Sequence, residues 1–138
     1  MGTWDTGSFG NDTAGDWSYG LKSVDDLSYV EDTLDKVLSH GSVSAVPADS
    51  AECAVAAAEI VARLRGRWGE ESAYTEAADE WVRNHPIRPP QSLVTKTLKA
   101  LDRLVVPPSE LLDLWSEAGD ADSWVANVAE LKQRVGTP

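Results

Sequence analysis

The segment from Asp49 to Arg65 is the sequence feature that most limits what this chain can fold into. Its apolar residues recur at helical spacing along one stripe, and further small apolar residues cover most of the remaining surface. The stripe is Cys53, Ala57, Ile60 and Leu64, and the flanking apolar residues are Ala54, Val55, Ala58 and Ala62. A helix that is apolar on nearly all sides is stable only when other elements surround it. The segment therefore predicts a central helix that its neighbours approach closely.

The residues at both ends of this segment support a helix with these limits. Asp49 and Ser50 are candidate N-caps, and Gly66 is a candidate stop. Three basic residues, Arg63, Arg65 and Arg67, gather near the C-terminal end, where positive charge interacts favourably with the helix dipole. We therefore expect these arginines to stabilise the C-terminal end of the helix by interacting with its dipole.

Other segments carry apolar stripes at the same three- and four-residue spacing. They are residues 23–40, 72–84, 91–106, 109–119 and 123–135, preceded by a short helix that Asn11, Asp12 or Thr13 caps. Glycines and prolines mark their ends, and no alternating β-branched run bounded by turn residues indicates a strand. The sequence predicts an all-α fold. We expect a compact single-domain bundle of about five to six helices over residues 1–138, with an ordered Gly/Trp-rich N-terminal loop.

The charge of the chain excludes one large class of partners. Asp and Glu number 23 against 12 Lys and Arg, which gives a formal net charge of −11. Proteins that bind the phosphate backbone of nucleic acids need a basic face, so we expect no nucleic-acid partner. No apolar run reaches the 18 residues of a membrane span, and a single cysteine fits a reducing compartment. We expect a cytoplasmic protein without a membrane partner.

No motif for catalysis, metal binding or phosphate binding is present in the sequence. Cys53 lies in the apolar stripe of the central helix, which is typical of a core residue. His40 falls in the last turn before Gly41, where it is expected to cap a helix, and His85 shares a face with Trp81. We therefore expect no catalytic residue, no metal and no cofactor, and a function that is not enzymatic.

The acidic residues are concentrated in the first half of the chain. Residues 1–62 hold 11 acidic residues and two lysines, a net charge of −9. One helix face gathers several of them: Asp25, Asp26, Glu31, Asp32 and Asp35. We call these five residues the predicted acidic face. Such a face attracts a basic protein by electrostatic steering, as an immunity protein or inhibitor would. The alternative is a solvated face that is partly paired with Lys96, Lys99 and Arg103.

The opening residues resemble a known family, the bacterial domain of unknown function 4259, which begins with the pattern Gly-x-Trp-x-x-Gly-x-Phe-x-Asn-Asp-x-Ala-x-Asp-Trp. The matching positions are Gly2, Trp4, Gly7, Phe9, Asn11, Asp12, Ala14, Asp16 and Trp17. Asp5 and Gly10 depart from the glycine and aspartate typical of those places. The resemblance extends over nearly the whole chain and implies a bacterial, cytoplasmic protein, with no assigned activity.

The motif residues allow two interpretations. In the first, Trp4, Phe9 and Trp17 anchor the N-terminal loop to the core, while Asn11, Asp12 and Asp16 cap a helix or face solvent. In the second, a pocket beside this loop binds a small ligand or a substrate, with Asp12, Asp16 and His85 as its polar groups. A concave pocket that at least two of these three side chains share would favour the ligand interpretation.

Overall fold

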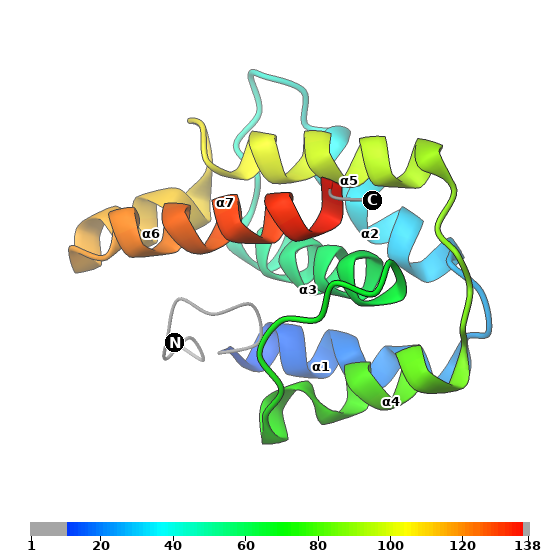
Figure 1. Ribbon diagram of the computed structural model, residues 1–138. Coiled ribbons are helices and arrows are strands. Elements are labelled where there is room, and N and C mark those ends of the chain that lie inside the picture. The colour runs from blue at the N-terminus through cyan, green and yellow to red at the C-terminus, as the bar shows by residue number, and fades with distance from the viewer. Residues whose placement is uncertain (1–10, 137–138) are drawn as a thin grey trace.

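The computed structural model describes residues 11–136 and contains seven α-helices and no strand within that range (Figure 1). The predictions for Trp4, Phe9 and the N-terminal loop lie outside the described residues. The helices are α1 (Asp12–Gly20), α2 (Ser28–Leu38), α3 (Ala48–Leu64), α4 (Glu76–Asn84), α5 (Gln91–Leu104), α6 (Glu110–Ala118) and α7 (Ala121–Gly136), with two 3₁₀ turns, η1 (Leu21–Ser23) and η2 (Ala73–Thr75). The all-α prediction is confirmed, with seven helices in place of five to six.

Helix α3 lies at the centre, in contact with α1, α2, α4, α5, α6 and α7. In Figure 1 it separates α5, α6 and α7 above from α1 and α4 below. Its alanines between positions 51 and 62 are fully buried, so neighbouring helices approach its backbone closely, as predicted. The start differs from the prediction, because Pro47 is the N-cap and Asp49 and Ser50 lie in the first turn. Gly66 ends the helix region with a φ of +84°.

Trp17 joins α1 to α2. Its indole Nε1–H donates to the Thr33 hydroxyl at 2.8 Å, and its ring stacks on Tyr29 with a centroid distance of 4.9 Å. The Tyr29 hydroxyl donates back to the Trp17 carbonyl at 2.8 Å. Burial, and to a lesser extent Cys53, raise the pKa of Tyr29. These contacts agree with a structural role for this motif residue.

Helix α2 begins at Ser28, five residues later than predicted. A carboxylate oxygen of Asp26 accepts hydrogen bonds from the backbone N–H of Ser28 at 3.0 Å and from its hydroxyl at 2.6 Å, and these bonds lower the pKa of Asp26. The residues before Ser28 therefore form a turn in place of helix. The apolar residues Val30, Leu34 and Val37, which recur at helical spacing, are fully buried, and Leu38 is partly buried.

The remaining helices lie close to their predicted ranges, but their apolar residues are not equally buried, since Leu111 is the one buried residue of α6. In α7 the four stripe residues Trp124, Val128, Leu131 and Val135 are all buried. Ser109 caps α6 through its hydroxyl oxygen, and Gly119 ends that helix with a φ of +82°.

A buried ion network holds α3, α4 and α7 together. Arg63 pairs with Glu59 one turn earlier, and its Nε–H donates to Asp79 at 2.7 Å. Asp79 also accepts from the Thr75 hydroxyl at 2.5 Å. Arg134 of α7 donates to both oxygens of Glu59 at 2.8 and 2.9 Å, and Glu59 and Glu130 raise the pKa of Arg134. Arg63 lies in the last turn of α3, as predicted, but its side chain is 2% exposed and pairs with two carboxylates, which the sequence did not indicate.

Candidate functional site

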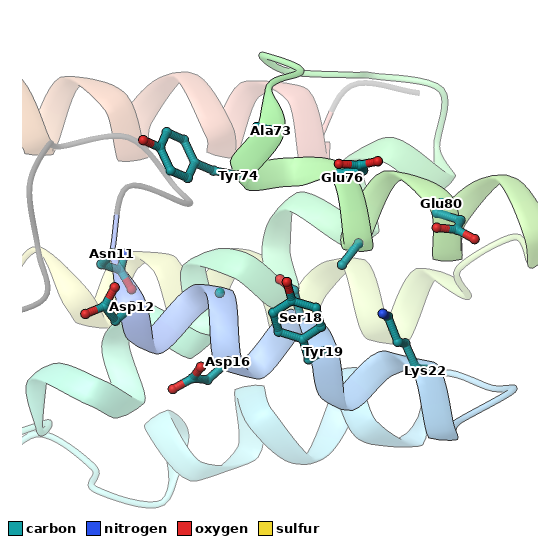
Figure 2. Close-up of a pocket in the computed structure, with 12 residues that line it drawn as sticks. Asn11, Asp12, Asp16, Ser18, Tyr19, Lys22, Ala73, Tyr74, Glu76 and Glu80 are labelled. Atoms are coloured by element: carbon teal, nitrogen blue, oxygen red, sulfur yellow. The ribbon is translucent and has the colours of Figure 1, made fainter.

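A pocket opens between α1 and the start of α4, with a volume of about 430 Å³ (Figure 2). One wall consists of α1 residues and Lys22 of η1, and the other of Tyr74 in η2 and residues of α4. The volume lies within the range of about 300–1,000 Å³ that is usual for ligand sites. The pocket is therefore large enough to hold a small molecule or a side chain of a partner protein.

Four carboxylates and one ammonium group line this pocket. Asp12 and Asp16 come from α1, Glu76 and Glu80 come from α4, and Lys22 is the cation. In each helix the two acidic residues are four positions apart in the sequence, so both lie on the same face of that helix. All four carboxylates are exposed, and Figure 2 shows the two pairs on opposite sides of the opening. The pocket thus carries an excess of negative charge.

Two tyrosines add aromatic surface to the acidic lining. Tyr19 and Tyr74 are 63% and 59% exposed, whereas the other aromatic rings between residues 11 and 136 are buried or half-buried. The Lys22 ammonium lies 4.8 Å from the centroid of the Tyr19 ring, within the distance of a cation–π contact. One ring of the pocket therefore already receives a cation from the chain itself.

Buried polar groups of α1 fix the inner wall. The Asn11 side chain accepts from the backbone N–H of Ala14 at 2.6 Å, which confirms that Asn11 is the N-cap of α1. The Ser18 hydroxyl donates to the Ala14 carbonyl at 2.9 Å. Gly15 lies between them on the lining, and a Cβ added there would meet no atom within 4 Å. A side chain at position 15 would extend into the pocket without a clash at its base.

The predicted acidic face is partly neutralised by the fold. Lys96 of α5 lies 2.8 Å from a Glu31 oxygen and 2.9 Å from an Asp35 oxygen, and these contacts raise the pKa of Lys96. Asp25 lies 3.2 Å from His85 Nε2. The pairing with Lys96 agrees with the alternative that this face is a solvated, internally paired surface.

Arg103 has a different role from the one considered in the sequence. Its guanidinium donates to the carbonyls of Gly41, Ser44, Val106 and Pro108 at 2.7–3.0 Å. It therefore holds the loop after α2 against the turn after α5, and contributes no pair to the predicted acidic face.

The histidines and the cysteine lie away from the pocket. His85 stacks on Trp81 with a centroid distance of 4.4 Å, and its Nδ1 lies 2.8 Å from the Trp81 carbonyl. His40 follows α2 with its ring 3.1 Å from the Ser44 hydroxyl. Burial, followed by the charges of Asp49 and Glu52, raises the pKa of the half-buried Cys53 thiol to about 11. The pocket lining thus holds carboxylates and a lysine, without a histidine or cysteine.

Two of the three polar groups named by the ligand interpretation share the pocket. Asp12 and Asp16 line it, and His85 does not. Sequence reasoning missed Tyr19, Lys22, Tyr74, Glu76 and Glu80. The four-residue spacing of Glu76 and Glu80 indicates that both lie on one face of their helix, but the sequence does not show which helix packs beside that face.

Two further observations concern the described part of the chain as a whole. Between residues 11 and 136 no three His, Cys, Asp or Glu side chains gather in a way that could hold a metal ion. No helix in this range combines the length and the apolar character that crossing a membrane requires.

Comparison with known proteins gives one family. The model of a family described as "Domain of unknown function (DUF4259)" matches residues 2–127. No curated protein and no solved structure matches the chain.

Proposed function

This chain belongs to the DUF4259 family of domains of unknown function, and we propose that it is a non-enzymatic protein-interaction module that binds a basic partner protein in the pocket between α1 and α4. The observation that carries the proposal is the lining of this pocket. Four carboxylates share it with a single lysine and two exposed tyrosine rings. An arginine or lysine side chain of a partner would satisfy both the negative charge and the aromatic surface.

Electrostatics favours a cation at this place for two reasons. Carboxylates that line one concave opening repel one another, and an inserted guanidinium or ammonium group relieves the repulsion. Tyrosine faces attract the same groups, with about 0.5–1 kcal/mol for an exposed contact. The net charge of −11 acts over a longer range and raises the rate of encounter with a basic partner.

The predicted acidic face has a secondary part in this proposal. Glu31 and Asp35 already share Lys96, so they offer less free negative charge than the pocket does. We expect the face to contribute to long-range attraction, and the pocket to provide the specific contact.

The proposal is tested with the fluorescently labelled peptide acetyl-Gly-Arg-Gly-Arg-Gly-amide, whose binding is followed by anisotropy at low salt. E76Q/E80Q removes two pocket carboxylates, and E117Q/D122N removes two exposed carboxylates outside the pocket lining. Both variants change the net charge by the same amount, and each includes one residue from a first helical turn. We expect the pocket variant to weaken binding about five- to ten-fold more than the control. Equal weakening by the two variants would contradict the proposal.

A second candidate function is the binding of a small cationic ligand. It is favoured by the volume of the pocket and by the joint presence of Asp12 and Asp16, which the ligand interpretation names. Spermidine and argininamide distinguish the two functions. If either binds more tightly than the peptide, and G15L abolishes that binding, the small-ligand function replaces the protein partner.

A further inference from the structure

A second cavity, with a volume of about 480 Å³, lies where the connector between α4 and α5 passes the end of α3. The connector runs up the edge of the molecule at which α3 ends (Figure 1). The lining residues are Leu64, Arg65, Pro86, Ile87, Arg88 and Gln91. Both charged groups among them are arginines. In a chain with almost twice as many acidic as basic residues, a cavity whose charged lining residues are both arginines favours a ligand of negative charge.

The backbone on both sides of Arg88 is rigid. Pro86, Pro89 and Pro90 each fix φ near −65°, and Pro89 is buried. The Ile87 N–H also donates to the His85 carbonyl at 2.7 Å. Little conformational freedom of this segment would be lost on binding, which favours affinity.

The backbone of Arg65 is fixed at the end of α3. It is the residue that directly follows α3, and its backbone N–H donates to the carbonyls of Val61 and Ala62 at 3.1 Å. Its side chain is half-buried, whereas that of Arg88 is exposed. The two arginines that line the cavity therefore differ in exposure.

The uncharged lining residues indicate that the remainder of a bound ligand is apolar. Leu64 and Ile87 are half-buried apolar residues that pack on the core, and Pro86 adds further apolar surface. Guanidinium groups bind planar carboxylates and phosphates through paired hydrogen bonds. We propose that this cavity binds a small organic anion, in which a carboxylate or phosphate is carried on an apolar body. This site is separate from the acidic pocket, because the two linings share no residue.

The test is a titration of the ¹⁵N-labelled full chain with four probes, observed by NMR. Benzoate and phenyl phosphate carry an apolar ring and distinguish the two anion types, inorganic phosphate lacks the ring, and benzylamine carries the ring with positive charge. We expect benzoate or phenyl phosphate to shift the backbone signals of Ile87, Arg88 and Gln91, with dissociation constants on the order of 1 mM for probes of this size. Benzylamine should leave these signals unchanged. Equal shifts with benzylamine, or binding of inorganic phosphate as tight as that of phenyl phosphate, would overturn the proposal.

Substitutions of Arg88 and Arg83 distinguish a specific contact of Arg88 with the anion from a general effect of positive charge. R88A should weaken the binding of the aromatic anion roughly five- to ten-fold, because it removes charge-assisted hydrogen bonds. R83A is the matched control, since Arg83 is also exposed but pairs with Glu71 and does not line the cavity. R88K keeps the charge without the guanidinium fork and should bind with intermediate affinity. Equal weakening by R83A and R88A would contradict a specific role of Arg88.

Discussion

The substitution D79N provides a quantitative test of the packing between α3 and α4. Asp79 is 3% exposed and accepts hydrogen bonds from Arg63 Nε and from the Thr75 hydroxyl. Asparagine has nearly the same shape, so the change removes the charge and one acceptor oxygen without creating a cavity. The buried Arg63 guanidinium then retains Glu59 and the Glu70 carbonyl as partners.

The expected loss of stability follows from these contacts. Removing one partner of a buried ion pair costs about 3–5 kcal/mol, because a buried charge loses its compensation. Glu59 still compensates part of the Arg63 charge, which places the expected loss at the lower end, about 3 kcal/mol. This is a large fraction of the free energy of unfolding of a typical domain, about 5–15 kcal/mol.

Urea unfolding followed by tryptophan fluorescence measures this loss. The denaturation midpoint should fall for D79N while the slope with urea concentration stays the same. The matched control is E71Q, which breaks the exposed Glu71–Arg83 pair and should cost less than about 1 kcal/mol. If D79N costs no more than E71Q, the buried network does not hold α4 on α3 as described.

Two further predictions concern other parts of the chain. Alanine substitutions at two glycines of α1 should act in opposite directions in urea unfolding: G15A stabilises by about 0.5–1 kcal/mol, because its Cβ meets no atom. G20A destabilises, because its Cβ would meet the Tyr29 hydroxyl; equal effects would refute this difference. Alkylation of Cys53 by iodoacetamide should accelerate with pH up to about 11, whereas the urea-unfolded chain should level off near pH 9. Because the pKa is raised in the folded state, the stability due to the protonated thiol is present below pH 9 and lost as the pH rises toward 11. A folded chain whose alkylation rate levels off near pH 9 would contradict the burial of the thiol.

Local sequence signals were sufficient to predict most of the helices. The stripe of α7 and the cap at Ser109 depend on residues within the same helix or next to it, so their positions follow from spacing and side-chain type. For α1 the same signals left three candidate caps, of which the structure selects Asn11. The start of α2 did not follow, because Asp26 binds Ser28 and forms a turn where the apolar spacing continues.

Contacts between distant segments could not be predicted in this way. Arg63 is far from Asp79 in the sequence, and its buried position depends on α4 packing against α3. The same limit applies to the acidic pocket. Asp12 and Asp16 were identified from the motif, but Glu76 and Glu80 become part of the same site only when α4 lies beside α1. Periodicity gives the apolar face of a helix, and does not identify the helix on the other side of a pocket.

The most direct test of the proposed function is to map where the arginine peptide binds on the ¹⁵N-labelled chain by NMR. Binding in the acidic pocket should shift the backbone signals of Gly15, Tyr19, Ala77 and Glu80, and G15L should abolish these shifts. Shifts that gather instead on α2 between Glu31 and Asp35, or that persist unchanged in G15L, would contradict the assignment of the pocket as the binding site.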